Sequence, residues 1–454
     1  MALGSLRAYA RELTMTPEGA RPPFLWGVST SSYQVEGAVR EDGRGPSIWD
    51  VRCYLGKVDN HDTGDVACDH YHRYREDIGL MKALGVGAYR FSVAWPRLQP
   101  TGRGAVNPAG LAFYDRLIDG LLEAGIEPWL CLYHWDLPQA LSDLGGWTNR
   151  DSHGWFADYA TIVARRLGDR VTRFATFNEP SVFTLFGYAM DWGAPGLIDR
   201  DAHSRAIHHV NLAHGLALDA IRAQTPRASI GAIHNRQTIL PETPGAANEA
   251  AAARLHDLWN LAFPEPQILG TYPPNLMPFL ERSIQDGDLA RIKRPNDWFG
   301  MNHYGPIYVR AAADTPWGFA WGNGPAEDSK TEIGWPVRAP MFRDELIETS
   351  RRYKLPVYVT ENGYGSHDAP DAGGEIVDER RIAYLDRHIS AMNEAIAMGA
   401  DIRGYFVWSL LDNFEWGAGF ANRFGLIYVD FATGERRIKA SGRWFADMIA
   451  AQRR

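Results

Sequence analysis

Eight short stretches of the chain are rich in Val, Ile, Phe, Tyr and Trp and are separated by longer amphipathic segments. Most of these stretches lack a clean alternation of apolar and polar positions, which is typical of strands buried on both faces in a parallel sheet. The predicted strands are residues 24–29, 88–94, 128–133, 173–177, 229–234, 298–302, 357–360 and 404–408.

The segments between these strands place apolar residues at three- and four-residue spacing, the period of an amphipathic helix. Residues 74, 78, 81 and 84 share one such face. The predicted helices are residues 72–84, 110–124, 155–167, 206–223, 343–353 and 379–398. Four of them are followed by a glycine in the position of a left-handed helix end, namely Gly85, Gly125, Gly168 and Gly399.

Eight strands that alternate with helices predict the α/β class and a single-domain (β/α)8 TIM barrel. Such a barrel needs about 250 residues, whereas this chain has 454. We therefore expect long loops at the C-terminal face of the barrel, and the clearest candidates are residues 36–65, 311–335 and 363–379. No linker or repeat divides the chain, so we predict a loosely attached lead-in over residues 1–21 and one catalytic domain over residues 22–454.

Composition narrows the function. The net charge of −8 argues against broad binding to nucleic acid or to an anionic membrane. The three cysteines form no CxxC pair, so neither a disulfide framework nor a zinc ribbon is expected. No secretory signal or membrane span is visible, so we expect a soluble, cytoplasmic protein. The 16 tryptophans exceed what packing needs, and they fit a protein that binds the flat faces of sugar rings.

Polar and aromatic residues stand at the end of nearly every predicted strand. Any one of them could be a helix cap or a satisfied core group, but the carboxyl ends of barrel strands all meet at one mouth, where such barrels carry their chemistry. In strand order they are Gln34 and Glu36; Arg90 and Trp95; His134, Trp135 and Asp136; Asn178 and Glu179; His234 and Asn235; Asn302, His303 and Tyr304; Glu361 and Asn362; and Trp408, Glu415 and Trp416.

Two carboxylates, Glu179 and Glu361, directly follow buried strands, and we expect them to face each other across the mouth. A structural salt bridge, for instance to Arg90, is the alternative explanation. Cleavage of a glycosidic bond uses two such groups. One carboxylic acid protonates the leaving oxygen, and one carboxylate stabilises or attacks the anomeric carbon. The pair therefore predicts a glycosidase.

Several longer motifs occur in one order along the chain. They are Phe-Leu-Trp-Gly at 24–27, Ser-Tyr-Gln-Val-Glu-Gly at 32–37, Tyr-Arg-Phe-Ser at 89–92, His-Trp-Asp-Leu-Pro at 134–138, Thr-Phe-Asn-Glu-Pro at 176–180, Thr-Glu-Asn-Gly at 360–363 and Trp-Ser-Leu-Leu-Asp-Asn-Phe-Glu-Trp at 408–416. With these motifs, residues 23–444 resemble glycoside hydrolase family 1, the β-glucosidases and their relatives.

The resemblance implies a retaining β-glycosidase that releases one terminal sugar, with glucose first and galactose or fucose also accepted. Glu179 would be the general acid/base and Glu361 the nucleophile that forms a covalent glycosyl-enzyme. These roles need a protonated Glu179, which apolar neighbours and the charge of Glu361 favour, and an ionised Glu361, which Arg90 can hold. The implied substrates are small β-glucosides or cello-oligosaccharides, with no cofactor and no metal.

The resemblance also assigns the remaining site residues. Asn178 would reach the sugar 2-hydroxyl, Trp408 would lie under the ring, and Trp335 would stack on the leaving group. The full substrate-binding set is Gln34, His134, Trp135, Asn178, Asn235, Tyr304, Trp335, Trp408, Glu415, Trp416 and Phe424. Arg90, Asn302 and Tyr304 would support the nucleophile.

The chain departs from the family pattern around the leaving group. Ser181 stands where Trp usually follows Asn-Glu-Pro, His303 replaces the first Tyr of Asn-Tyr-Tyr, and Pro336 replaces the Glu of Gly-Trp-Glu. None of these departures touches Glu179 or Glu361, so they bear on the choice of substrate and leave the mechanism as implied.

Two other functions stay open from the residues. A metal-dependent barrel enzyme could use Asp69, His70, His72, His208, His209 and His214, but these lie within or before predicted helices and no HExxH motif occurs. A barrel that binds sugar without cleaving it is the second alternative. Because both carboxylates are intact, hydrolysis is the preferred hypothesis, with transfer to an alcohol as a variant of it.

Overall fold

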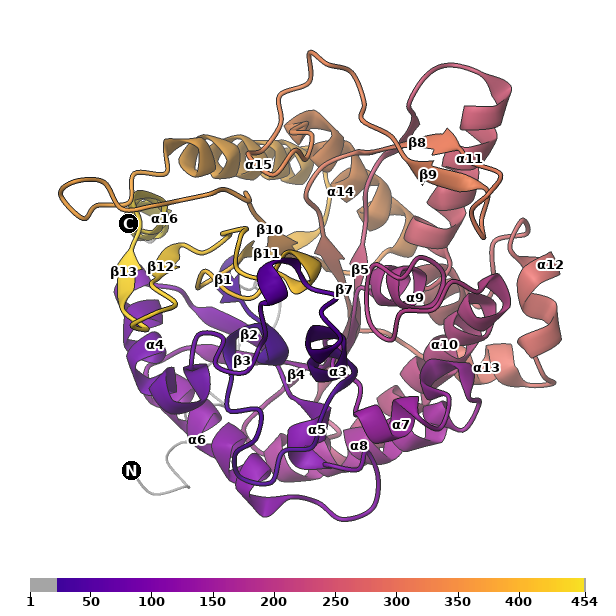
Figure 1. Ribbon diagram of the computed structural model, residues 1–454, viewed down its shortest axis with the longest axis horizontal. Coiled ribbons are helices and arrows are strands. Elements are labelled where there is room, and N and C mark those ends of the chain that lie inside the picture. The colour runs from indigo at the N-terminus through magenta and orange to yellow at the C-terminus, as the bar shows by residue number, and fades with distance from the viewer. Residues whose placement is uncertain (1–22, 453–454) are drawn as a thin grey trace.

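The computed structural model describes residues 23–452, in which eight parallel strands close into a barrel in the order β1-β11-β10-β7-β5-β4-β3-β2 (Figure 1). The strands are β1 (Leu25–Ser29), β2 (Ala88–Ser92), β3 (Glu127–Tyr133), β4 (Arg173–Asn178), β5 (Ser229–Asn235), β7 (Trp298–Asn302), β10 (Val357–Asn362) and β11 (Ile402–Trp408). All eight coincide with predicted strands, so the predicted TIM barrel is confirmed. The predicted lead-in, residues 1–21, lies outside the described residues, and the division into lead-in and single domain stays a prediction.

Helices surround the barrel on its outer side (Figure 1). They are α4 (His70–Leu84), α6 (Pro108–Glu123), α8 (Ser152–Leu167), α10 (Arg200–Gln224), α14 (Ala339–Tyr353), α15 (Glu379–Ala397) and α16 (Ala440–Gln452). Six match the predicted helices within a few residues, and α16 was missed. It packs Phe445 and Ile449 into the core, and its Gln452 accepts a hydrogen bond from Trp26 Nε1.

Of the four glycines predicted to end helices in a left-handed conformation, Gly168 is required for a different reason. Gly85, Gly125 and Gly399 do adopt positive φ after their helices, but Gly168 has φ −69° and is right-handed. A Cβ at residue 168 would lie 1.9 Å from Thr225 Oγ1 and 2.5 Å from the Ala164 carbonyl oxygen. Close approach of α10 to the end of α8 therefore requires a glycine there.

The residues beyond the basic barrel form loops at the carboxyl ends of the strands. The predicted loop over residues 36–65 contains α3 (Ile48–Tyr54), and α2 (Ser32–Val35) lies just before it. The predicted loop over residues 311–335 begins at the end of β8 (Ile307–Ala311) and contains β9 (Phe319–Trp321). The excursion between β5 and β7 was not predicted as a long loop. It contains β6 (Ile239–Pro241), α11 (Ala246–His256), α12 (Met277–Leu280) and α13 (Asp288–Ile292). Strand β6 joins β8 and β9 in a separate three-stranded sheet.

The remaining short elements complete these connections. They are η1 (Asp59–His61), α5 (Trp95–Leu98), α7 (Gln139–Ser142), η2 (Gly146–Thr148), α9 (Pro180–Tyr188), η3 (Asp257–Leu261), η4 (Glu265–Leu269), η5 (Glu281–Ser283), η6 (Trp416–Ala418), β12 (Ile427–Val429) and β13 (Arg436–Ile438). No helix within residues 23–452 is both long and apolar enough to cross a membrane.

Large aromatic side chains fill the barrel interior away from the mouth. The ring of Trp129 lies 5.2 Å from Trp298, 4.7 Å from Tyr358 and 5.2 Å from Phe406, measured between centroids. This layered filling is how a TIM barrel builds a solid core. The interior can therefore hold a ligand only at the carboxyl ends of the strands.

Candidate active site

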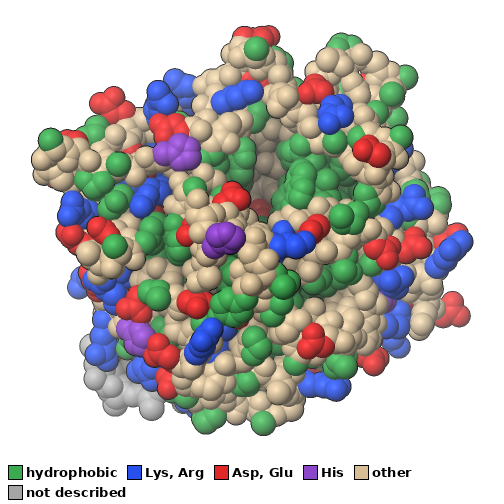
Figure 2. Space-filling model, viewed as in Figure 1, with side chains coloured by type: hydrophobic (Ala, Val, Ile, Leu, Met, Phe, Trp, Pro, Cys, Tyr) green, Lys and Arg blue, Asp and Glu red, His purple; other side chains and the backbone are tan. Residues whose placement is uncertain are grey.

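A cavity of about 510 Å³ opens among the loops at the carboxyl ends of the strands. Figure 2 shows the opening as a hollow between two raised parts of the surface, with hydrophobic side chains gathered along its wall. Eight predicted site residues line this cavity: Trp135, Glu179, Asn235, Tyr304, Trp335, Glu415, Trp416 and Phe424. The other predicted residues lie beside them, and hydrogen bonds and ring contacts join most of them to this set.

Glu361 is a buried carboxylate that the barrel holds from two sides. It is the next-to-last residue of strand β10. Arg90 from β2 places its Nη1 2.5 Å from Glu361 Oε1. The hydroxyl of Tyr304 donates to Oε2 at 2.7 Å. A guanidinium and a donated hydroxyl both favour the charged form of a carboxylate. Each oxygen of the Glu361 carboxyl group therefore has its own partner, a cation on one side and a hydroxyl donor on the other.

The motif around Glu361 has a steric cause. A Cβ at Gly363 would lie 1.9 Å from the carbonyl oxygen of Trp408, so the loop after β10 can pass this point only with glycine. The contact brings the ends of β10 and β11 together and places Glu361 near the aromatic residues of the next strand.

Glu179 directly follows β4 and begins the short helix α9 with a left-handed backbone, φ 48°. Such a conformation costs energy in a non-glycine residue and is concentrated at functional sites. Burial raises the pKa of the Glu179 carboxyl, and the charge of Glu361 raises it further. A hydrogen bond from Asn302 and the charge of Arg90 oppose this, and the resulting pKa is about 8. Glu179 is therefore protonated at neutral pH, as a general acid must be.

A short hydrogen-bond network connects the two carboxyl groups. Asn302 Nδ2 donates to Glu179 Oε1 and to Asn178 Oδ1, both at 3.0 Å. Arg90 Nη2 donates to the same Asn178 oxygen at 2.6 Å, and Thr360 donates to Asn302 Oδ1 at 2.7 Å. Arg90 therefore contacts Glu361, as its predicted supporting role requires. The Asn302 amide contacts Glu179 and Asn178 instead, so its support of the nucleophile stays a prediction.

Aromatic rings form one side of the site. The His134 ring stacks on Trp408 and on Trp416, each with centroids 5.8 Å apart. Trp135 packs against Trp416 at 4.6 Å. Burial lowers the pKa of His134 well below its usual range, and the Arg90 charge lowers it further, so the imidazole is neutral. A neutral ring can donate and accept hydrogen bonds at once, which suits recognition of sugar hydroxyls.

Glu415 is a third buried carboxyl group at the mouth. Trp408 Nε1 donates to its Oε1 at 3.2 Å. Burial raises the pKa of Glu415, and the charge of Glu361 raises it further. The Trp408 hydrogen bond lowers it, and the resulting pKa is about 8. Gln34 lies beneath this loop and donates to Asn413 Oδ1 and to the Phe414 carbonyl, both at 2.9 Å. Gln34 therefore ties the loop after β1 to the Glu415 loop, and its direct contact with substrate stays a prediction.

The structure adds aromatic residues that the sequence analysis did not assign to the site. Trp49 lines the cavity and packs on Trp416 at 4.6 Å. Farther out, an aromatic wall consists of Phe186, Trp192, Trp259 and Trp321, with neighbouring ring centroids 5.0–6.0 Å apart. The high tryptophan content was the available signal, but it did not say which tryptophans meet.

The histidines of the metal hypothesis have other partners. His70 pairs with Asp77, and His208 pairs with Asp288 and Tyr272. His209 contacts the Trp147 carbonyl, and His214 contacts the Thr176 hydroxyl. Within residues 23–452, no group of three His, Cys, Asp or Glu side chains is arranged to hold a metal ion.

A closed α/β barrel with two buried carboxyl groups in one aromatic cavity is the arrangement found in carbohydrate-cleaving barrel enzymes. Within that class the chain belongs to glycosyl hydrolase family 1, whose family model matches residues 18–454.

Similar proteins agree with this assignment. A β-glucosidase from Agrobacterium sp. is 43% identical over 94% of this chain and 94% of its own length. A bifunctional β-D-glucosidase/β-D-fucosidase from Bifidobacterium breve is 40% identical over 94% of this chain and 97% of its own length. The solved family 1 β-glucosidase from Thermotoga maritima superposes with a TM-score of 0.90 at 40% identity, covering 96% of this chain and 98% of that one.

Proposed function

We propose that this enzyme is a retaining, exo-acting β-glucosidase in which Glu361 is the nucleophile and Glu179 the acid/base. The observation that carries the proposal is the unequal environment of the two carboxyl groups. Arg90 and Tyr304 hold Glu361 at both oxygens, whereas no Lys or Arg among residues 23–452 forms an ion pair with the buried Glu179. Opposite protonation states in one cavity are what the two roles require.

In the first step, a Glu361 oxygen forms a bond to the anomeric carbon while the bond to the leaving oxygen breaks. Glu179 transfers its proton to that oxygen, so the alcohol leaves neutral. Esterification removes the negative charge of Glu361. That charge had raised the pKa of Glu179, so this pKa falls once the glucosyl-enzyme has formed. Glu179 therefore stays ionised after it has given up its proton.

In the second step, Glu179 accepts a proton from water, whose oxygen attacks the anomeric carbon and releases Glu361. Two inversions at the same carbon retain the β configuration. An alcohol in place of water would give transglycosylation by the same route.

The inner part of the cavity suits one neutral sugar. With a pKa of about 8, the Glu415 carboxyl group carries a proton near neutral pH, so it can donate to one sugar hydroxyl and accept from a neighbouring one. His134 and Asn178 offer polar groups beside Glu361. We assign Asn178 to the 2-hydroxyl and Trp408 to the ring face. A 6-phosphate near Glu415 would be repelled once that carboxyl group is ionised, as the pH rises through about 8. Glucose is the proposed sugar because the relatives named above are β-glucosidases, and fucose and galactose are further candidates.

The outer part of the cavity suits a leaving group with a flat apolar face. Trp335 lies 5.3 Å from Tyr304 and is 42% exposed, and the aromatic wall faces the same cavity. Aryl β-glucosides and cello-oligosaccharides both offer such a face. The cytoplasmic location and the lack of nucleic-acid and membrane partners stay predictions from the sequence.

The test is turnover of a panel of p-nitrophenyl glycosides, with and without EDTA. The panel contains the β-glucoside, β-galactoside, β-fucoside, α-glucoside and 6-phospho-β-glucoside. We expect turnover of the neutral β-glycosides, unaffected by EDTA, with the β configuration kept in the first product. No turnover of any β-substrate would refute the proposal, and inverted product would refute the role of Glu361.

A further inference from the structure

Tyr384 reaches from the outer helix α15 to the ends of two barrel strands. Its side chain is 2% exposed. The ring stacks on His388 with centroids 3.8 Å apart and contacts Tyr364 at 5.8 Å. These contacts fix the ring, so the hydroxyl has a defined place between the ends of β7 and β10.

The Tyr384 hydroxyl is used as both donor and acceptor. It donates to the Tyr304 carbonyl oxygen at 3.0 Å and accepts from Asn362 Nδ2 at 3.0 Å. Asn362 also donates to the His303 carbonyl at 2.6 Å and accepts from the Tyr405 hydroxyl at 2.6 Å. A buried polar cluster in which each group has a partner is rigid, and any lost member leaves another group unsatisfied.

This cluster returns to the nucleophile by two routes. Along the chain, Asn362 is the residue after Glu361, and the His303 amide donates to the Glu361 carbonyl at 3.0 Å. Through side chains, Tyr384 holds the main chain of Tyr304, whose hydroxyl donates to Glu361 Oε2. A closed ring of contacts thus joins Tyr384, Tyr304, Glu361 and Asn362.

We infer that Tyr384 is a positioning residue for the reaction: by holding the Tyr304 main chain against Asn362, it sets the Tyr304 hydroxyl on the Glu361 carboxylate. The inference rests on the proposed role of Glu361 as nucleophile. Its physical basis is that reacting groups must be held within a fraction of an ångström, which their own backbone seldom achieves without support behind it.

The variant Tyr384→Phe removes one hydroxyl and keeps the ring packing. We expect kcat/KM for an aryl β-glucoside to fall about tenfold, as a small misplacement at a reacting group does. We also expect the acid limb of the pH profile of kcat/KM to move up by about half a pH unit, because a misaligned Tyr304 hydroxyl stabilises the Glu361 anion less. A residue that only stabilises the fold would leave this limb in place.

A double-mutant cycle with Tyr304→Phe tests the route. If Tyr384 acts through Tyr304, then adding Tyr384→Phe to Tyr304→Phe produces little further loss of kcat/KM. Fully additive losses would overturn the inference. If Tyr384→Phe does not fold, Tyr405→Phe tests the same ring from the Asn362 side, and the acid limb should move in the same direction.

Tyr159→Phe is the matched control. Tyr159 on α8 is equally buried, and its hydroxyl donates to the carbonyls of Val93 and Leu132 near the ends of β2 and β3. It contacts neither Glu361 nor Tyr304 through these bonds, so we expect an unchanged acid limb. An equal shift in both variants would overturn the inference. Absence of turnover by the unaltered enzyme would refute the proposed function itself, and the inference with it.

Discussion

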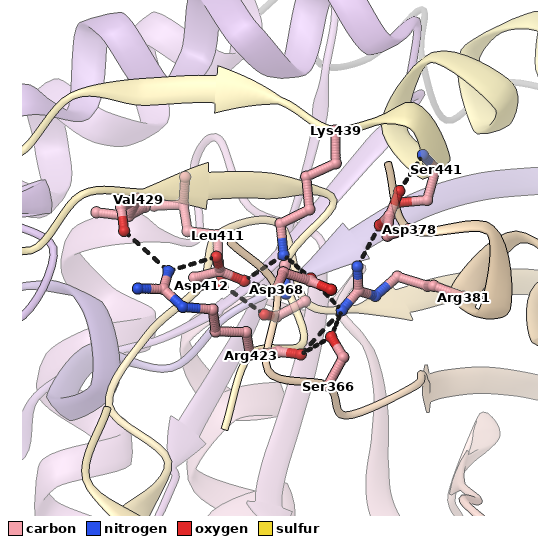
Figure 3. Close-up of polar contacts among 12 residues, drawn as sticks. Ser366, Asp368, Asp378, Arg381, Leu411, Asp412, Arg423, Val429, Lys439 and Ser441 are labelled. Atoms are coloured by element: carbon pink, nitrogen blue, oxygen red, sulfur yellow. Dashed lines mark hydrogen bonds and ion pairs between the residues drawn. The ribbon is translucent and has the colours of Figure 1, made fainter. Parts of the chain in front are cut away.

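Two buried charge clusters lie near each other at the carboxyl ends of β10 and β11, and they are built on opposite principles. In the active site, the carboxyl groups of Glu179, Glu361 and Glu415 influence one another, and Arg90 is the buried cation paired with Glu361. The second cluster (Figure 3) holds Asp368, Asp378 and Asp412 together with Arg381, Arg423 and Lys439.

The second cluster is balanced in charge and satisfied in hydrogen bonds. Lys439 Nζ lies 2.6 Å from Asp368 and 2.7 Å from Asp412, and Arg423 pairs with Asp412 at 2.8 Å. Arg381 joins Asp368 to Asp378. Burial alone would raise the pKa of Asp368, but the charges of Arg381 and Lys439 outweigh it and lower the pKa to about 2. Through Lys439, which directly precedes α16, the cluster joins the loop after β10 and the loop after β11 to the start of that helix.

The difference teaches how one fold separates stability from chemistry. Where each buried carboxylate has a cationic partner, the ion pairs support the fold, and the pKa of Asp368 is lowered. Where carboxyl groups outnumber cations, burial and mutual repulsion push a pKa from its usual value to about 8, and a proton becomes available near neutral pH. Active sites accept such destabilising arrangements, and neighbouring structure compensates for them.

The largest expected effect comes from removing the nucleophile. Glu361→Ala should lower kcat for aryl β-glucosides by about 10⁵- to 10⁶-fold, because the covalent step is lost. The measurement is steady-state turnover, with circular dichroism to establish that the variant is folded. Retention of near-full activity would show that the charge imbalance serves another purpose.

Removing the acid should have a graded effect. Glu179→Ala should lower kcat/KM by roughly 10²- to 10⁴-fold for poor leaving groups such as alkyl alcohols, and far less for dinitrophenol, which leaves without a proton. In the unaltered enzyme, kcat/KM for poor leaving groups should fall as the pH rises through about 8, where Glu179 loses its proton. That alkaline limb should be absent in the variant. Equal losses for all leaving groups would contradict this role.

Breaking the balanced cluster should damage stability. Lys439→Met leaves Asp368 and Asp412 with one cation fewer, and we expect the free energy of unfolding to fall by about 3–5 kcal/mol. Urea unfolding measures this. The control is Arg443→Ala, which breaks an exposed pair with Glu375 and should cost about 0–1 kcal/mol. Similar losses in the two variants would mean that the buried cluster has no special weight.

Relieving the unbalanced cluster should have the smallest effect, and the opposite sign. The pKa of Glu179 is near 4 in the unfolded chain and about 8 in the folded enzyme. Between these two values a rising pH makes the folded enzyme less stable, because Glu179 loses its proton more readily in the unfolded chain. At pH 8, Glu179→Gln should therefore have a free energy of unfolding in urea roughly 1–3 kcal/mol higher than that of the unaltered enzyme. Near pH 4 the two free energies should converge. A constant difference across this range would argue against a buried, uncharged Glu179.

Much of this molecule could be predicted from local pattern. The eight barrel strands were predicted because strands buried on both faces form apolar runs of the correct length. The bounds were less accurate where polar residues extend a strand. Asn178, Glu361 and Asn362 belong to β4 and β10, although their side chains resembled loop residues. The excursion after β5 was missed because its short helices and strands lack a strong period.

The candidate site divides in the same way. Glu179, Glu361 and their motif neighbours were predicted because their position at strand ends and their residue types are local properties. Tyr384 and the aromatic wall were not, because nothing near them in the sequence distinguishes them from core aromatics. Trp192 and Trp321 are 129 residues apart along the chain, yet their rings lie 5.0 Å apart.

The sequence by itself determined the class of fold, the order of its strands along the chain and the residue types that perform the chemistry, because hydrophobic period and strand-end composition are read directly from neighbouring residues. The family resemblance implied a protonated Glu179, and the physical cause of its raised pKa is visible only in the tertiary structure. Burial, the charge of Glu361 and the reach of Arg90 set the pKa of Glu179, and each of these depends on side chains that the closed barrel brings together from distant strands.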